Sequence, residues 1–199
     1  MFWDKVAIFY DLFENLYNRQ VYVNMGKAVA GLVGVADEVL ECACGTGAIS
    51  VYVAPQCKHL TATDCSEKML KQAARKLKDF SNVEVRTLDM TFIAYPDDSF
   101  DKVVAGNVIH LLDNPVAVVD ELVRVCKPGG KVIIPTYINI QVDGKESFVV
   151  RLFEKAGAHF KKQFDLDSYK AFFQDAGYDR VTYQVVEGKM PCAIAVIAK

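Results

Sequence analysis

Short runs rich in β-branched residues alternate with helix-length segments through the middle of this sequence, and no other feature constrains the fold as much. A strand, a helix and a second strand fold back as a right-handed crossover, so successive strands of this kind pair in parallel with helices on both faces. The expected strands are Val39–Cys42, Leu60–Thr63, Val83–Leu88, Asp101–Ala105 and Lys131–Pro135.

Two of the intervening segments carry clear helix signals. Residues 66–78 have apolar side chains at helical spacing on one face and lysines on the other, and Ser66 is expected to cap the first turn. Asn114–Pro115 opens a helix that is expected to run to about Cys126. Lys127–Gly130 is then expected to stop this helix before the next strand begins.

The C-terminal part follows a different pattern. A helix is expected from Leu166 to Ala176, and the strand-like runs Arg180–Val186 and Pro191–Ala198 are close enough in sequence to form a hairpin. The sequence therefore predicts a doubly wound α/β fold of the Rossmann-like kind. It has a mostly parallel seven-stranded sheet with helices on both faces and a C-terminal antiparallel hairpin.

A chain of 199 residues is long enough for a single domain with one continuous core. Within this domain we expect an N-terminal helical lid or substrate segment at 1–36 and a cofactor-binding core at 37–137. Residues 138–199 are expected to form a substrate-side segment and the C-terminal hairpin. The aromatic first segment fits either a lid over an aromatic or lipid-like acceptor or a helix packed on the domain.

Charge and composition exclude several classes of function. A net charge of −2 and a pI near 5.9 give no basic face for a nucleic-acid partner. The sequence shows no transmembrane segment and no signal-peptide pattern, so a cytoplasmic location is expected. Six cysteines without a C-x-x-C pair, together with three scattered histidines, predict reduced, mostly buried thiols and no metal site.

Candidate binding residues directly follow the expected strands. In an open α/β sheet, ligands bind beyond the carboxyl ends of the strands, so these residues should meet in one crevice. The first strand leads into residues 41–47, which contain small residues that let a ligand approach the backbone. Asp64 follows the second strand and suits the vicinal hydroxyls of a ribose. Asp89 and Met90 follow the third strand and suit an adenine amino group and ring face, and Asn107 follows the fourth.

Each of these residues also has a structural interpretation. Gly45 and Gly47 could form only a tight turn between a strand and a helix, and Asp64 could simply cap the next helix. Asp89 could be a turn residue, and Met69 and Met90 could fill the core. Their joint placement, one after each successive strand, is what favours a binding site.

The alternative nucleotide is a dinucleotide, because Gly45-x-Gly47-x-x-Ser50 nearly fits the fingerprint of NAD-binding proteins. Ser50 stands where that fingerprint needs glycine or alanine, and Glu41 places a negative charge where a pyrophosphate would approach. A carboxylate at this position suits a ligand with a cationic centre, such as the ammonium group of a methionine moiety. The residues therefore favour S-adenosylmethionine as the cofactor, with S-adenosylhomocysteine as its product.

The ordered motifs resemble those of class I S-adenosylmethionine-dependent methyltransferases. Residues 39–47 are similar to their first motif, residues 63–70 to their second, and residues 88–90 to their third. Residues 100–110 resemble the segment around the fourth strand and residues 127–130 the turn before the fifth. Within this superfamily the chain looks most like the small ubiquinone/menaquinone-biosynthesis type, because residues 6–12 are similar to a tyrosine-aspartate segment that precedes the core.

The resemblance implies roles for the matching residues. Glu41 and the backbone of residues 43–47 would hold the methionine end, Asp64 the ribose and Asp89 the adenine amino group. Asn107 would contribute a backbone contact near the sulfonium, and Tyr10 would close over the cofactor. The complete set of expected cofactor contacts is Tyr10, Glu41, Ala43, Cys44, Gly45, Gly47, Asp64, Cys65, Met69, Asp89, Met90 and Asn107.

Two positions depart from the family pattern. Ala43 stands where the loop commonly begins with glycine, and a common aspartate is replaced by Glu41. We expect Ala43 to be tolerated if its backbone φ is negative, since alanine then adds only a methyl group.

Methyl transfer needs mainly alignment of the nucleophile and exclusion of water. If the acceptor must lose a proton, His110 is the candidate base because it follows the fourth strand; it could equally begin the next helix or pack against a lid. The expected function is S-adenosylmethionine-dependent methyl transfer to a small-molecule acceptor. The alternatives are an NAD-dependent oxidoreductase and a catalytically silent cofactor-binding protein.

Overall fold

The structure is a computed structural model that describes residues 18–138, 141–142, 145–146 and 162–199. Its strands are β1 (Glu38–Cys42), β2 (His59–Asp64), β3 (Val83–Thr87), β4 (Phe100–Ala105), β5 (Cys126–Tyr137), β6 (Gln141–Val142), β7 (Lys145–Glu146), β8 (Val181–Val186) and β9 (Cys192–Ala198). The helices are α2 (Arg19–Ala30), α3 (Ser50–Val53), α4 (Glu67–Leu77), α5 (Pro115–Val125) and α7 (Leu166–Asp175), with 3₁₀ turns η1 (Ala54–Gln56) and η2 (Ile109–Leu111).

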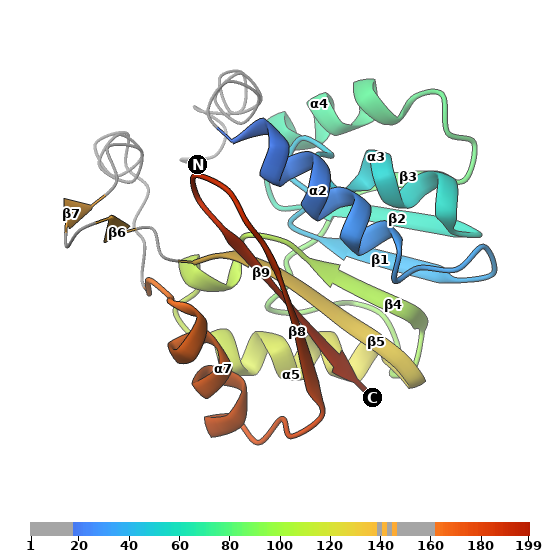
Figure 1. Cartoon of the computed structure of the whole chain (residues 1–199). Coiled ribbons are helices and arrows are strands. Elements are labelled where there is room, and N and C mark those ends of the chain that lie inside the picture. The colour runs from blue at the N-terminus through green and yellow to red at the C-terminus, as the bar shows by residue number, and fades with distance from the viewer. Residues whose placement is uncertain (1–17, 139–140, 143–144, 147–161) are drawn as a thin grey trace.

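Seven strands form one sheet in the order β3-β2-β1-β4-β5-β9-β8. The five strands from β3 to β5 pair in parallel, while β9 pairs antiparallel with both β5 and β8 (Figure 1). The predicted doubly wound sheet with a C-terminal antiparallel hairpin is confirmed. The strand order reverses between β1 and β4, and their carboxyl ends therefore flank the switch point where ligands bind in such sheets.

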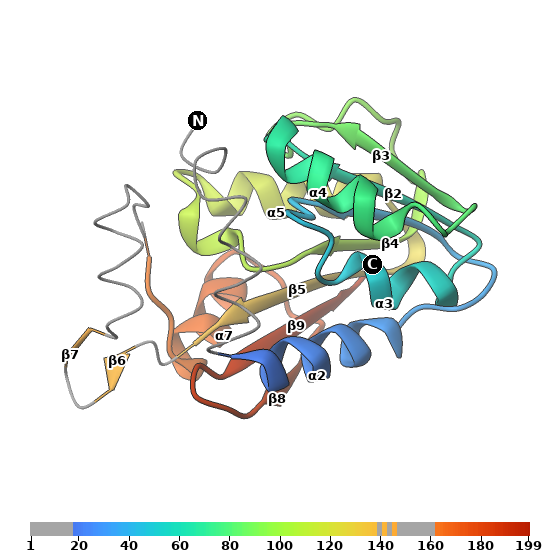
Figure 2. The same cartoon turned by 90° about the horizontal axis from the view of Figure 1, so that it is seen from above.

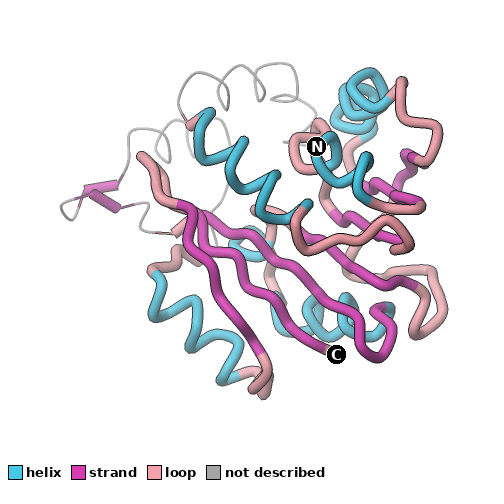
Figure 3. Tube along the Cα trace, turned by 45° about the vertical axis from the view of Figure 1, so that its right-hand side comes forward, coloured by secondary structure: helices cyan, strands magenta, loops and turns pink. Residues whose placement is uncertain are grey.

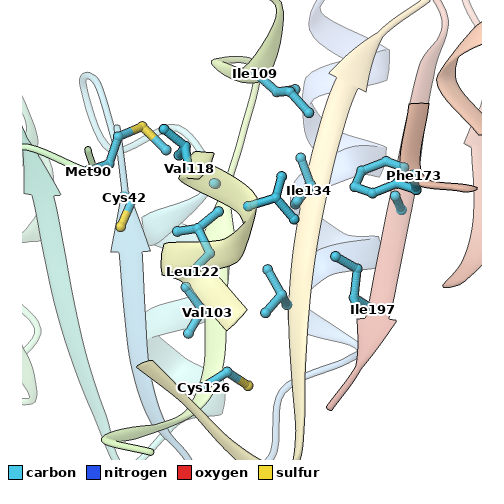
Figure 4. Packing of buried hydrophobic residues seen from close by; sticks show 14 of the residues in the cluster. Cys42, Met90, Val103, Ile109, Val118, Leu122, Cys126, Ile134, Phe173 and Ile197 are labelled. Atoms are coloured by element: carbon cyan, nitrogen blue, oxygen red, sulfur yellow. The ribbon is translucent and has the colours of Figure 1, made fainter. Parts of the chain in front are cut away.

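Helices cover both faces of the sheet, as Figures 2 and 3 show. Alternate strand residues point to opposite faces, so each face has its own buried cluster. Leu40 and Val103 belong to the cluster that includes α5 and α7, and Figure 4 shows Val118 and Leu122 of α5 among the buried side chains. Val39 and Val104, their chain neighbours, belong to the cluster that includes α2, α3 and α4.

The caps of two helices follow from local sequence. The Ser66 hydroxyl accepts a hydrogen bond from the Met69 amide at the start of α4, as predicted. The Asn114 side chain accepts from the Ala117 amide, and Pro115 occupies the first position of α5, where a missing N–H costs nothing.

The junction between α5 and β5 differs from the expectation. The helix ends at Val125, and β5 begins at once with Cys126, which pairs with Phe100. Residues 127–130 form an irregularity in the pairing before Lys131 resumes the register opposite Lys102. Gly130 passes so close to β4 that an added Cβ would lie 2.7 Å from the Asp101 carbonyl oxygen. The predicted stop is therefore a bulge inside a longer strand.

The ring of Tyr169 in α7 is completely buried, and its hydroxyl donates a 2.6 Å hydrogen bond to the Ile134 carbonyl of β5. We expect Tyr169→Phe to lower the free energy of unfolding by about 1–2 kcal/mol, because the buried hydrogen bond is lost while the ring packing remains. Denaturant unfolding measures this change. Tyr183→Phe is the matched control on a partly exposed neighbouring ring, and we expect about 0.5 kcal/mol or less. Equal losses would contradict the assignment.

Candidate functional site

A cavity of about 260 Å³ opens at the carboxyl ends of the first four strands. Its position beside the β1–β4 switch point is the one expected for a ligand site in this fold. Ten of the predicted contacts line it: Glu41, Ala43, Cys44, Gly45, Asp64, Cys65, Met69, Asp89, Met90 and Asn107.

Two predicted site residues are absent from the described lining, and the position of a third is not described. Tyr10 is outside the described residues. Gly47 is not in the cavity wall but packs toward α4, where an added Cβ would lie 3.4 Å from the Ala73 Cα. His110 lies in η2, only 4% exposed, and is likewise absent from the described lining.

The loop after β1 turns through left-handed backbone conformations. Gly45 and Gly47 have φ values of 55° and 83°, which glycine adopts without steric cost. Ala43 has a φ of 53°, so the condition of a negative φ, under which we expected alanine to be tolerated here, is not met. The loop keeps the conformation that favours glycine although residue 43 carries a side chain, and that conformation is strained for alanine.

Asp64 holds this loop and the start of α4 at the same time. One carboxylate oxygen accepts a 2.9 Å hydrogen bond from the Gly45 amide, and the other accepts a 2.8 Å bond from the Ser66 amide. Burial raises the pKa of Asp64, while these hydrogen bonds lower it. The side chain and the backbone of Cys65 also hydrogen-bond to this carboxylate and lower its pKa.

Asp89 is oriented by its own loop. Its Oδ1 accepts hydrogen bonds from the backbone amide and the hydroxyl of Thr91, at 2.9 and 2.7 Å. The following segment is tied to α5, because Arg124 donates to the carbonyls of Ile93 and Tyr95 at 2.8 and 2.9 Å. These contacts hold the Asp89 carboxylate at the end of the cavity next to β3.

Glu41 is the most deeply buried charged group of the site, with 1% of its surface exposed. Burial raises the pKa of its carboxyl to about 8; the Ser50 hydroxyl opposes this shift and the Asp64 carboxylate reinforces it. Glu41 Oε2 has no hydrogen-bond partner among the described residues. A buried carboxylate oxygen without a donor is costly, and it indicates that a ligand supplies one.

Asn107 lies beyond β4 with a φ of 53°, a conformation that asparagine tolerates better than most residues. Its backbone amide donates to the Pro135 carbonyl at 2.8 Å, and its side-chain Nδ2 contacts the Met25 sulfur at 3.8 Å. Its Oδ1 is buried without a hydrogen-bond partner. The site therefore contains a second buried acceptor, beside the strand that carries Glu41.

His110 is poorly suited to act as a base. Burial lowers the pKa of its imidazole to about 4, so the ring is neutral and weakly basic at physiological pH. His110 therefore lies in a buried helical turn after β4 and not in the described cavity lining, so its role as a base stays a prediction that this position does not favour.

Several lining residues were not predicted from the sequence. Tyr22 and Met25 come from α2, and Leu111 and Leu112 follow Asn107. The apolar spacing of Val21, Met25 and Val29 indicates only that α2 packs on the sheet. No local signal shows that one edge of this helix reaches the cavity.

The described residues contain neither a cluster of metal ligands nor a membrane-spanning helix. Among the described side chains, no group of three or more histidines, cysteines and acids could hold a metal ion. No helix in the described part of the chain is long and apolar enough to cross a membrane.

Glu41, Asp64 and Asp89 therefore give the cavity three carboxyl groups at successive strand ends, and Asn107 adds a buried carbonyl oxygen. Such a site fits a ligand with a positive charge and several hydrogen-bond donors. A pyrophosphate would meet only repulsion beside Glu41.

Comparison with known proteins supports this interpretation. Residues 40–134 match the family model described as a methyltransferase domain. The chain is 36% identical over 135 residues to the demethylmenaquinone methyltransferase of Clavibacter sepedonicus, which covers 66% of this chain and 54% of that protein. It is 27% identical over 205 residues to the demethylmenaquinone methyltransferase of Listeria welshimeri, covering 90% and 87% of the two chains.

The fold is also similar to that of a solved SAM-dependent methyltransferase from Aquifex aeolicus. The two structures align with a TM-score of 0.65 and 22% sequence identity, over 94% of this chain and 93% of the other.

Glu41→Gln tests two properties of the buried carboxyl: its effect on protein stability and its contribution to ligand binding. The folded-state pKa of about 8 lies above the ordinary value of 4.5, so the wild-type protein loses stability as pH rises through this interval. We expect the variant to lack this loss and to be more stable than wild type at pH 9. We also expect its affinity for S-adenosylhomocysteine at pH 8 to fall about tenfold or more, because a charge-assisted hydrogen bond is lost.

Thermal unfolding at pH 5 and pH 9, with calorimetric titration at pH 8, measures both effects. A variant with unchanged affinity and the wild-type dependence of stability on pH would show that Glu41 has neither property.

Ala43→Gly tests the strain in the loop. Glycine relieves the left-handed conformation, and we expect the free energy of unfolding to rise by about 0.5–1 kcal/mol. The control is Ala28→Gly inside α2, where the same substitution should lower stability by about 1 kcal/mol. Urea unfolding measures the free energy of unfolding of both variants. Loss of stability in both would mean that Ala43 is not strained.

Proposed function

We propose that this chain is a class I methyltransferase that transfers a methyl group from S-adenosylmethionine to a hydroxylated aromatic ring of the quinol type. The observation that carries the cofactor assignment is the set of three carboxyl groups at successive strand ends, with Glu41 Oε2 buried and unpartnered. The names of the relatives support the acceptor class.

The described residues fit the cofactor. Glu41 and the Oδ1 of Asn107 would accept hydrogen bonds from its ammonium group, which supplies the donors that both buried atoms lack. The backbone of residues 43–47 would pass along the methionine moiety. Asp64, which hydrogen bonds to two loops hold at the cavity, would accept from the ribose hydroxyls, and Asp89 would accept from the adenine amino group.

The remaining cavity residues would enclose the adenosine. Cys65 and Met69 lie on the β2–α4 side and Met90 on the β3 side, so they present thiol and thioether surface to the ribose and the base. Residues 37–137 would thus act as the cofactor-binding core. Residues 1–36 and 138–199 would contribute to the acceptor side.

The sulfonium methyl is an electrophile, so the reacting ring must be electron-rich, as in a quinol. When bound, S-adenosylmethionine would supply this methyl group: the sulfur–methyl bond would break as the bond to the ring carbon forms, the ring would lose a proton to solvent, and S-adenosylhomocysteine would be the neutral thioether product. The protein's part is to bind both molecules in line and to exclude water. No proton transfer is assigned to His110, since its imidazole is buried outside the cavity wall.

Two measurements test this proposal. Calorimetry should detect micromolar binding of S-adenosylhomocysteine and none of NAD, and Asp64→Asn should weaken that binding about tenfold or more because the charged acceptor is lost. With S-adenosylmethionine, a 1,4-naphthoquinol that carries a short prenyl chain and no ring methyl should be methylated. The same quinol with the ring position already methylated is the control acceptor.

Binding of NAD alone would overturn the cofactor assignment. Binding of S-adenosylhomocysteine without turnover of any quinol would leave the cofactor assignment in place and overturn the acceptor class.

A further inference from the structure

The sheet order separates the cavity into two chemically different sides. The three carboxyl groups follow the order of the strands. Asp89 follows β3, Asp64 ends β2 and Glu41 lies in β1, and these strands are arranged in that order toward β4. Beyond Glu41 the described lining becomes uncharged. Tyr22 and Met25 of α2 and Leu111 and Leu112 after β4 form this side, and we call these four residues the apolar wall.

Met25 is held in place by contacts from two distant parts of the chain. Its sulfur lies 3.5 Å from the Cys192 sulfur at the start of β9 and 3.8 Å from Asn107 Nδ2 beyond β4. Both neighbours have N–H or S–H groups that can donate to a thioether, and Met25 is 1% exposed. A methionine side chain is normally adaptable, but this one has a fixed sulfur position.

The helix that carries Met25 is itself fixed. The Asn18 side chain donates to the Met190 carbonyl at 3.0 Å and accepts from the Met190 amide at 3.5 Å. At Gly26 an added Cβ would lie 2.3 Å from the Tyr52 ring of α3, so the two helices are in close contact. Because α2 can neither slide nor rotate without breaking these contacts, the apolar wall is preorganised.

The amide of Asn107 links this wall to the cofactor side. Its Nδ2 contacts the Met25 sulfur, and its Oδ1 is thereby left as the buried acceptor that we assign to the cofactor ammonium. Met25 therefore lies one side chain away from the proposed methionine end of the cofactor. A ring that receives the methyl group must bind next to that end.

We propose that Met25 is a specificity-determining residue for the acceptor, and that the reacting ring packs against its thioether. This inference rests on the proposed function, since it assigns the subsite of the same reaction. A thioether makes favourable contacts with aromatic rings, and Tyr22 beside it adds an aromatic surface braced edge-on against Tyr137 at 6.0 Å. The fixed wall favours a flat, uncharged ring of defined width.

Met25→Leu and Met69→Leu form a matched pair, because both remove a buried thioether from the same cavity with little change in volume. The apolar wall contains Met25, whereas Met69 lies beside Asp64. We expect Met25→Leu to weaken naphthoquinol binding to the protein loaded with S-adenosylhomocysteine by about twofold to tenfold, with affinity for S-adenosylhomocysteine itself unchanged. We expect Met69→Leu to show the reverse.

Selectivity between two acceptor rings gives a second readout. This selectivity would not change if Met25 had only a structural role. In turnover, Met25→Leu should change the ratio of kcat/KM for the prenylated naphthoquinol to that for a benzoquinol with the same chain. Met69→Leu should leave this ratio unchanged. Thermal unfolding of both variants establishes that they are folded.

The binding measurement does not depend on turnover, so the two proposals fail in different ways. Wild-type protein that binds the naphthoquinol without methylating it would overturn the proposed reaction, while the subsite would still be decided by the two variants. Equal naphthoquinol binding by wild type and Met25→Leu would overturn the role of Met25. Absence of naphthoquinol binding to the wild-type protein would overturn both.

Discussion

The Asp64 carboxylate joins the two loops on which the binding site is built, because it accepts the Gly45 amide with one oxygen and the Ser66 amide with the other. The first bond fixes the loop after β1, and the second fixes the start of α4. The parallel sheet places these loops side by side, since β1 and β2 are neighbours at the switch point. A residue that would otherwise be only a helix-terminal acid thus sets the spacing between the proposed methionine and ribose sites. The carboxyl groups of Glu41 and Asp89 then extend the same edge in both directions.

This edge of the sheet also contains residues in energetically unfavourable environments or conformations. Glu41 is buried without a donor for Oε2, and Ala43 adopts a φ of 53°. Both features cost stability in the free protein, and both are explained if a cationic ligand completes the site. The surrounding contacts tolerate the cost because they are numerous: β1 is paired on both sides, and Arg124 ties the segment after Asp89 to α5. Of the three non-glycine residues with positive φ in the described part of the chain, Ala43 and Asn107 line the proposed cofactor site and Asp98 does not.

The other side of the cavity depends on contacts between distant segments. Met25 joins α2 to β9 and to the residues beyond β4, and Asn107 connects this cluster to the cofactor side. The antiparallel hairpin consequently does more than complete the sheet, because Cys192, the first residue of β9, contacts a residue of the apolar wall. Variation in α2 or in the hairpin could change the acceptor while the parallel core and its carboxyl groups remained the same. Relatives that share the core can in this way differ in their acceptors.

The sequence by itself determined the strand order along the chain, the C-terminal hairpin, the Ser66 cap, and the acids at the ends of β1, β2 and β3. These features depend on the periodicity of short segments and on the rule that parallel strands end at one edge. Only the tertiary structure decided that Ala43 has a positive φ, that the turn at 127–130 is a bulge within β5, that His110 is buried outside the cavity wall, and that Tyr22 and Met25 belong to that wall. The physical reason is separation along the chain. Met25 and Cys192 are 167 positions apart, and no local pattern specifies which side chains meet once the sheet and its helices have packed.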